Sequence, residues 1–158
     1  MSTLDAGYRF EKFVTQLLRD LGYRAERNLI YRNGSGEKHQ IDIDYEYRNG
    51  IWRKKRLVVG ECKYSGMNNR MDAGAALEQL ATNTKFAGAD EGILFTNKEL
   101  SRKEMKMMDR EKGLYVCHRP ILLAMDRKAN GRQKTSLEKR INNIKLSGAD
   151  YQPSYRSV

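Results

Sequence analysis

An acidic and a basic residue near the middle of the chain have the types and spacing of a hydrolytic site. Glu61 and Lys63 end a β-branched apolar stretch, 57–60. Because side chains alternate between the two faces of a strand, Glu61 and Lys63 point one way while Cys62 and Tyr64 point the other. Placing an acid beside a base at the end of a half-buried strand is unfavourable unless the pair has a use.

A second alternating stretch, 41–45, places Asp42 on one face of an upstream strand. An acid on one strand and Glu-x-Lys on the next is the layout of a metal-dependent phosphodiesterase. Mg²⁺ (or Mn²⁺) prefers oxygen ligands and keeps several waters, so Asp42 and Glu61, with the backbone carbonyl of Cys62 between them, can hold such an ion. Lys63 can hold the attacking water and stabilise charge that develops on the phosphate.

The N-terminal segment 5–21 is predicted to be an amphipathic helix that could bring a third acid to this site. Glu11 lies at the border of its apolar face, so it is either an ordinary solvated residue or, if the helix packs over the sheet edge, a further metal ligand. The apolar face has the i, i+3/i+4, i+7 spacing of a helix and consists of Phe10, Phe13, Val14, Leu17, Leu18 and Leu21.

Three strands are expected next, at 23–32, 39–47 and 51–64, and Asn49-Gly50 is a strong hairpin signal. A two-residue turn there pairs Asp42 with Leu57, which leaves Glu61 about 13 Å further along. One ion cannot bridge that distance. Asp42 lies opposite Glu61 only if the loop is longer, centred near 51–52, or if a bulge re-aims the strand.

The rest of the chain alternates helices with short strands. A polar loop at 65–71 is followed by a helix at 72–86, a strand at 91–96, a helix from 101 to 112 and a strand at 114–117. The resulting order, α-β-β-β-α-β-α-β, predicts an α/β fold with a mixed β-sheet flanked by helices.

Positive charge is concentrated at the C-terminal end. The 158-residue chain carries a net charge of +10, and residues 127–158 contain eight Lys and Arg against two Asp and Glu. We therefore expect one domain at 1–126 and a basic extension at 127–158, with a helix at 135–146 and a loose last dozen residues. The basic run 53–56 is either a solvated hairpin tip or a contact to phosphates. This charge favours a polyanionic partner.

Several other classes of protein are disfavoured. The two cysteines, Cys62 and Cys117, lack a metal-ligand spacing and are expected to be free buried thiols, and the two histidines form no ligand cluster. No apolar run approaches a membrane span and the start is not a signal peptide, so an intracellular location, without an organic cofactor or a membrane partner, is expected.

On these residues the sequence resembles the PD-(D/E)xK nuclease superfamily, and more narrowly the Mrr-type restriction endonucleases and the archaeal Holliday-junction resolvases. The resemblance covers about 5–122 and implies a restriction-endonuclease-like fold acting on DNA, with a homodimer as the expected assembly. Its matching segments are Gly7–Glu11, Arg32–Gly36, Gln40–Ile43, Val58–Lys63 and Gly92–Asn97.

The resemblance also implies roles for single residues. Glu11, Asp42, Glu61 and Lys63 correspond to the catalytic set, although Ile41 replaces the proline that commonly precedes the aspartate. Many relatives carry Gln-x-x-x-Tyr on the next helix, and here Gln79 is followed by Asn83. Asp44, on the same face as Asp42, is a candidate supporting group. Residues expected to contact DNA are Arg32, Ser35, Lys38 and Gln79.

Three functions are compatible with this pattern. The first is a metal-dependent DNA endonuclease, either a resolvase of branched DNA or a restriction or repair nuclease. The second is a non-catalytic nucleic-acid-binding module on a degenerate nuclease fold. The third is a subunit whose basic tail binds a partner protein. The intact acid–acid–lysine set favours the first, because a lost activity removes the reason to keep three ionisable groups together.

Overall fold

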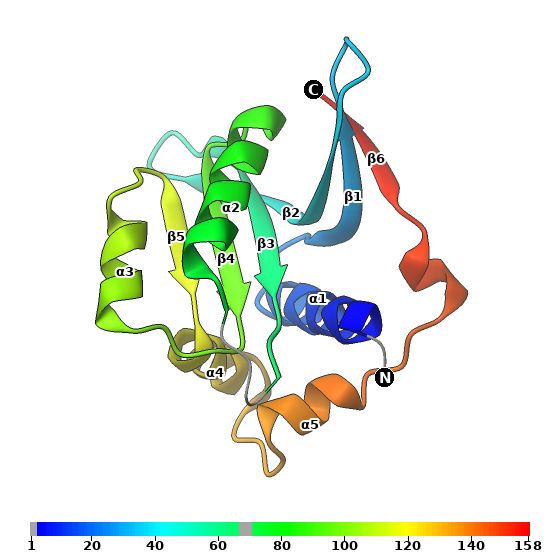
Figure 1. Ribbon diagram of the computed structural model, residues 1–158, viewed down its shortest axis with the longest axis vertical. Coiled ribbons are helices and arrows are strands. Elements are labelled where there is room, and N and C mark those ends of the chain that lie inside the picture. The colour runs from blue at the N-terminus through cyan, green and yellow to red at the C-terminus, as the bar shows by residue number, and fades with distance from the viewer. Residues whose placement is uncertain (1–2, 67–70) are drawn as a thin grey trace.

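A computed structural model describes residues 3–66 and 71–158 of the chain (Figure 1). The expected α-β-β-β-α-β-α-β order is present and is followed by four more elements. The full order is α1 (Thr3–Asp20), β1 (Glu26–Arg32), β2 (Lys38–Asn49), β3 (Lys54–Lys63), α2 (Ala73–Ala87), β4 (Glu91–Thr96), α3 (Arg102–Asp109), β5 (Leu114–Cys117), α4 (Arg119–Asn130), α5 (Leu137–Asn142), a 3-10 helix η1 (Gly148–Tyr151) and β6 (Ser154–Ser157).

The strands form one mixed sheet in the order β5-β4-β3-β2-β1-β6. The pairs β1–β2 and β2–β3 are antiparallel, whereas β3–β4, β4–β5 and β1–β6 are parallel. The predicted α/β class with a mixed sheet flanked by helices is therefore confirmed.

The register between β2 and β3 shows the length of the turn at Asn49-Gly50 and which residues of the two strands lie opposite each other. Asn49 pairs with Lys54, so the turn contains the four residues 50–53 rather than two. The pairing continues to Ile43 opposite Gly60, and the same register places Asp42 opposite Glu61. The longer loop, and not a bulge, brings the two acids together.

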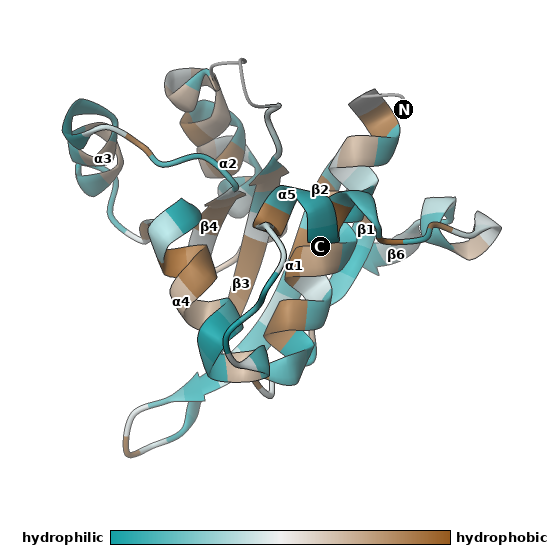
Figure 2. Cartoon of the chain, turned by 90° about the horizontal axis from the view of Figure 1, so that it is seen from below, coloured by the Kyte–Doolittle hydropathy of each residue, from teal (hydrophilic) through white to brown (hydrophobic). Residues whose placement is uncertain are grey.

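Helices cover both faces of the sheet. One face packs against α1, α4 and α5 around Phe10, Phe95 and Leu122, and the apolar sides of α2 and α3 pack on the other around Leu80 and Leu94. Cys62 and Tyr64 contact the first of these cores, opposite to Glu61 and Lys63, as the strand alternation predicted. Figures 1 and 2 show α1, α4 and α5 gathered together on one side of the sheet.

Strand β2 changes direction near Asp42. Ile41 packs with Leu29 and Val59, whereas Ile43, two residues later, packs with Phe10 in a different cluster. A regular strand would place both isoleucines on one face. The paired strand β1 carries Asn28 opposite this point, and Asn28 has a left-handed φ of 54°, which explains the local distortion.

The C-terminal part differs most from expectation. Helix α4 was not predicted, although Pro120 at its first turn is a known helix-start signal. The expected loose last dozen residues instead form η1 and the edge strand β6, which pairs with β1. The predicted helix at 135–146 is shorter, at Leu137–Asn142.

Other boundaries follow the sequence closely. Ser101 caps α3 with the predicted capping box to Glu104, although the helix ends at Asp109 rather than at residue 112. Within the predicted polar loop at 65–71, residues 67–70 lie outside the described part of the chain. None of the helices among the described residues is long and apolar enough to cross a membrane.

Candidate active site

Glu61 and Lys63 stand at the end of β3, on the face that α2 covers. Lys63 Nζ lies 3.2 Å from Glu61 Oε1 and donates a hydrogen bond of 3.1 Å to Gln79 Oε1. Glu61 is only 3 % exposed and also accepts a hydrogen bond from Asn83, one turn beyond Gln79. Helix α2 therefore holds both members of the Glu-x-Lys pair through two amide side chains.

Asp42 lies on the neighbouring strand, at the bend of β2. The backbone N–H of Cys62 donates a hydrogen bond of 2.8 Å to Asp42 Oδ2. This bond forms one residue beyond the last backbone pair of β2 and β3, so the carboxylate takes the place of a ladder carbonyl. One oxygen of Asp42 is thus fixed by the backbone, beside Glu61.

Glu11 reaches the same place from α1. The helix packs on the sheet through Phe10, Val14 and Leu17, which leaves Glu11 buried, at 7 % exposure, at the border of this apolar face. Its carboxyl group shares a hydrogen bond with Asp42 and accepts another of 3.2 Å from Arg27. The helix thus packs on the strands that carry Asp42 and Glu61, and Glu11 joins the site.

The four predicted catalytic residues are therefore brought together from α1, β2 and β3. Burial, with repulsion from Asp42, raises the pKa of Glu11 to about 9 and the pKa of Glu61 to about 7. The cations Arg27 and Lys63 oppose these shifts without cancelling them. The pKa of Asp42 is also raised by burial, against the hydrogen bond from Cys62.

This donor set fits a hard divalent cation. Oxygen ligands are those that Mg²⁺ and Mn²⁺ prefer, and crowded, raised-pKa carboxylates are stabilised as anions when a cation joins them. Among residues 3–66 and 71–158, however, no three His, Cys, Asp or Glu side chains are arranged to hold one ion. Asp42 and Glu61 fit as a pair, whereas Glu11 is engaged by Arg27.

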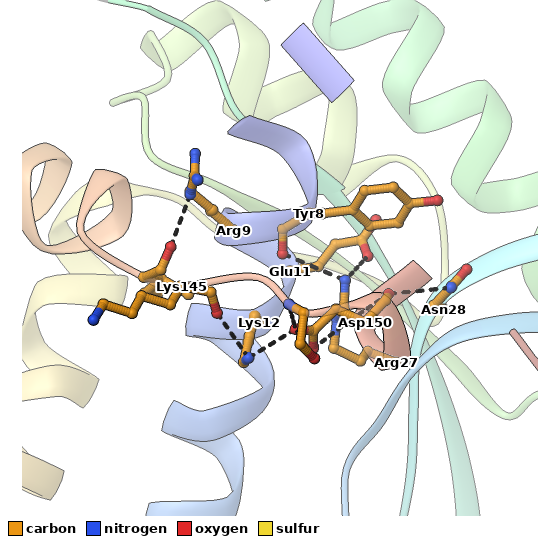
Figure 3. Close-up of polar contacts among 10 residues, drawn as sticks. Tyr8, Arg9, Glu11, Lys12, Arg27, Asn28, Lys145 and Asp150 are labelled. Carbon is orange, nitrogen blue, oxygen red and sulfur yellow. Dashed lines mark hydrogen bonds and ion pairs between the residues drawn. The ribbon is translucent and has the colours of Figure 1, made fainter. Parts of the chain in front are cut away.

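Figure 3 shows how Arg27 connects the site to the C-terminal segment. Its NH2 donates to Glu11 Oε2 and, at 3.4 Å, to the Tyr8 carbonyl, while its NH1 donates to the Asp150 carbonyl at 3.0 Å. Asp150 is held in turn by Lys12, with Nζ 3.0 Å from Oδ2. Arg27, although only 11 % exposed, thus bridges α1 and η1.

The residues predicted to contact DNA divide into two groups. Gln79 lies in the site, bonded to Lys63. Arg32, Ser35 and Lys38 lie on the exposed end of the β1–β2 hairpin, where Ser35 donates to Asn33 Oδ1 at 2.8 Å. No contact between these three residues and the four acidic and basic groups is present among the described residues.

Two residues of the site were missed by sequence reasoning. Asn83 occupies the position where relatives carry tyrosine, and it bonds Glu61, the Gln40 carbonyl and His39 Nδ1. The four-residue spacing from Gln79, which puts both on one helix face, was the available signal. Arg27 carried no such signal, because its partners come from distant segments.

Asp44 does not join the site. Its Oδ2 accepts hydrogen bonds from Tyr31 Oη at 2.6 Å and from Arg156 Nε at 3.2 Å, and its side chain is buried. The preference for Asp42 over Asp44 thus agrees with the geometry. Cys62 and Cys117 are free thiols, as expected, and burial raises the pKa of both.

Comparison with known proteins places this geometry in a family. Residues 4–125 match the family model Mrr_cat, described as restriction endonuclease. A comparison with curated proteins finds no match.

Three solved structures share the fold. AF1548, a protein of unknown function, has a TM-score of 0.57 at 20 % identity, over 80 % of this chain and 72 % of its own. The DNA modification-dependent restriction endonuclease AspBHI has a TM-score of 0.60 at 17 % identity, over 90 % of this chain and 39 % of its own. The MspJI restriction endonuclease in complex with a 27-mer oligonucleotide has a TM-score of 0.52 at 18 % identity, over 94 % of this chain and 34 % of its own.

The chain thus spans little more than a third of AspBHI and MspJI. The predicted PD-(D/E)xK fold of Mrr type is confirmed. Because the family model matches most of its length, the chain belongs to the Mrr_cat family of restriction endonucleases.

Proposed function

We propose that this protein is a Mg²⁺- or Mn²⁺-dependent endonuclease that hydrolyses phosphodiester bonds in DNA. The observation that carries the proposal is the convergence of Glu11, Asp42, Glu61 and Lys63 from three elements onto one place at the central strands β2 and β3. Burying three carboxyl groups beside one another is unfavourable for folding, and a nuclease centre gives that arrangement a use.

Each residue has a distinct role in this proposal. Asp42 and Glu61 would hold the cation, with the Cys62 carbonyl beside them and with Glu11 as a further ligand once released from Arg27. The bound ion would supply Lewis-acid polarisation of the phosphate and of an attacking water. Lys63, held by Glu61 and Gln79, donates hydrogen bonds toward the water and the developing negative charge.

The family match supports a restriction-type activity on duplex DNA over resolution of branched DNA. Cutting both strands in one binding event needs two sites, so we further propose that the protein acts as a homodimer, which light scattering of the intact chain would measure. As an enzyme acting on DNA, it would work inside the cell. Arg32, Ser35 and Lys38, on the projecting β1–β2 hairpin, are proposed to contact the DNA backbone.

The decisive experiment measures cleavage and binding on the same variants. Labelled duplex and junction DNA are incubated with Mg²⁺, Mn²⁺ or EDTA, and affinity is measured separately in EDTA. Asp42→Ala or Glu61→Ala removes a metal ligand, so cleavage should fall by about three orders of magnitude. Binding in EDTA should stay equal or tighten up to about fivefold, because a carboxylate that repels phosphate is lost.

Lys63→Ala should differ from these variants, because it removes a positive charge: cleavage is lost and binding weakens modestly. Glu111→Ala, which removes an exposed carboxylate away from the site, is the matched control and should cleave like the wild type. Wild-type cleavage rates in Asp42→Ala and Glu61→Ala would show that the site is misplaced.

The non-catalytic binding module is the second candidate. It is favoured by one observation, the engagement of Glu11 by Arg27 in place of a three-carboxylate metal cluster within the described residues. DNA binding by the wild type without cleavage in Mg²⁺ or Mn²⁺, on every DNA tested, would establish that function instead.

A further inference from the structure

The turn between β2 and β3 exposes two large apolar side chains. Ile51 is 93 % exposed and Trp52, the single tryptophan of the chain, is 92 % exposed. Both stand on the four-residue turn that the β2–β3 register defines, and neither belongs to a core cluster of the described residues. Figure 2 shows this hairpin extending beyond the rest of the chain, with hydrophobic colour at its tip. Two adjacent side chains of this size do nothing for the fold there.

Cations surround this apolar tip. Arg48, Arg53, Lys54 and Lys55 are exposed, and Arg56 follows them. Lys55 pairs with Glu46 at 2.9 Å, and Arg56 lies near Asp90 and Glu91. The other three form no ion pair with any described residue, so their charge faces solvent. An apolar pair within a ring of positive charge is suited to a polyanion that also offers flat apolar surfaces.

The tip lies on the same two strands as the candidate active site. Arg48 pairs with Lys55 near the tip, and in the same register Asp42 lies opposite Glu61. Lys55 and Glu61 are six positions apart on β3, so their side chains lie on the same face of that strand. A cavity of about 730 Å³ lies between the two ends of this face and is lined by Asp44, Arg48, Lys55 and Leu57. Lys54 and Glu61 are seven positions apart, about 23 Å at the rise of a strand, which equals about seven base pairs of duplex.

We propose that the β2–β3 hairpin is a DNA-contacting wedge: Trp52 and Ile51 contact bases while Arg48, Arg53 and Lys54 contact phosphates, about seven base pairs from the bond that is cut. The proposal rests on the proposed function, since it names a second contact to the same DNA. Aromatic and apolar side chains contact bases by stacking or by wedging between base steps.

The charge of the tip favours DNA over a second copy of this chain, because two such tips would bring like charges together. An anionic membrane surface also attracts cations and tryptophan, but the tip shares its strand face with the nuclease site, where DNA is expected.

Trp52 makes the test direct, because its fluorescence is the whole tryptophan signal of the protein. In EDTA, a 20-base-pair duplex is added to the intact protein, and emission and acrylamide quenching are followed. Stacking of the indole on a base should quench emission and protect it from acrylamide. Affinity is measured by anisotropy of the labelled duplex, so that the two signals are independent.

Trp52→Ala should weaken DNA binding about tenfold, the loss of one stacked base. Arg53→Gln combined with Lys54→Gln should weaken binding and reduce the salt slope by up to about two, since two cations that neutralise phosphates are removed. Tyr115→Ala is the matched control: it removes an exposed aromatic side chain on the edge strand β5, outside the β2–β3 hairpin, and should leave affinity unchanged. Because the tip packs on no core, the melting temperature of Trp52→Ala should equal that of the wild type.

Unchanged emission at saturating DNA, together with wild-type affinity of Trp52→Ala, would overturn the wedge. If Trp52 emission changes with protein concentration in the absence of DNA, the tip contacts a second copy of the chain and the wedge is wrong. If emission changes on addition of phosphatidylserine vesicles and not on addition of DNA, the tip contacts a membrane and the wedge is likewise wrong. Parallel cleavage assays with Mg²⁺ test the nuclease proposal separately from the wedge proposal. If the wild type cleaves DNA while Trp52 emission does not change, only the wedge proposal is wrong.

Discussion

At the scale of single residues, the site is defined by carboxyl groups that folding places unfavourably close. Glu61 is almost fully buried between α2 and Asp42, and its pKa is raised to about 7 although Lys63 lies beside it. Such a group is half protonated near neutral pH. The protonation state of the site, and with it metal binding, should therefore respond to pH in the physiological range.

Metal affinity should rise with pH through about 7. A proton and a divalent cation compete for Glu61, so Mn²⁺ binding should weaken progressively below its pKa and level off well above it. Isothermal titration of the intact protein with Mn²⁺ from pH 5.5 to 8.5 checks this without DNA. A pH-independent affinity would contradict a metal role for Glu61.

The raised pKa values also affect the stability of the protein without bound metal. Because the folded-state pKa values of Glu61 and Glu11 lie above that of an unfolded glutamate, the folded protein keeps protons that the unfolded chain has lost. The free energy of unfolding should accordingly fall as pH rises from about 4.5 through 7, on the order of 2–3 kcal/mol for Glu61. Urea unfolding in EDTA measures it, and Glu61→Gln should remove the part of this pH dependence that Glu61 contributes while the part from Glu11 remains.

Replacing Arg27 distinguishes the effect of its charge on metal binding from its role in positioning the site. It is the cation closest to Glu11, so Arg27→Gln should tighten Mn²⁺ binding several-fold by removing repulsion. Cleavage at saturating Mn²⁺ should nevertheless fall about tenfold, because the bridge by which Arg27 holds α1 against η1 is lost. Lys12→Gln breaks the other ion pair of Asp150 without contacting Glu11 and serves as the control. Weaker metal binding in Arg27→Gln would indicate structural damage instead.

At the scale of elements, the position of α2 decides the geometry of Glu61 and Lys63. The helix carries Gln79 and Asn83, and it lies close to β4 because Gly92 has no side chain. A Cβ atom at Gly92 would clash with Thr84 Oγ1 and would lie 2.9 Å from Leu114 and 3.1 Å from Leu80. The close approach of helix and strand therefore depends on this glycine.

Gly92→Ala should destabilise the protein by about 1–3 kcal/mol, since helix and strand must move apart. Displacement of α2 should also lower cleavage, because it shifts the partners of Lys63. Gly34→Ala is the matched control: its added Cβ meets nothing within 4 Å and its φ is not left-handed. Thermal unfolding of both variants makes the comparison, and equal melting temperatures would refute the packing argument.

At the scale of the whole molecule, the basic C-terminal region is part of the fold. Helix α5 packs on α1 through Leu137 and Ile141, and β6 extends the sheet beside β1, where Arg156 bonds Asp44. Deleting residues 127–158 would therefore remove core packing along with charge. The contribution of this region to DNA binding therefore has to be measured by substituting its charged residues in the intact chain.

We expect the exposed cations of this region to add affinity without sequence or shape preference. Arg132→Gln with Lys134→Gln, in the exposed segment between α4 and α5, should weaken binding to duplex and junction DNA equally. The salt slope should decrease by up to about two, about one for each phosphate-neutralising cation that is removed. Anisotropy titrations at salt concentrations from about 50 to about 200 mM check this. A selective loss for one DNA shape would contradict it.

Much of this architecture was predictable from the sequence because its signals are local. The alternation of the 57–64 segment placed Glu61 and Lys63 on one face, and the helical spacing of 5–21 placed Glu11 at the edge of the apolar stripe. The capping box at Ser101 and Glu104 is complete within four residues. Short-range sterics and hydrogen bonding determine such features, so the order of residues suffices to predict them.

What only the tertiary structure decided depends on contacts between distant segments. The choice between two hairpin registers, and with it the meeting of Asp42 and Glu61, required the four-residue turn that places Ile51 and Trp52 in solvent. The bridge from Glu11 through Arg27 to Asp150 joins residues more than a hundred positions apart. Four residues, 154–157, have too little local signal to be recognised as a strand, and they form β6 because β1 offers them an unpaired edge. Such interactions arise from the packing of whole elements, which no local pattern of residues encodes.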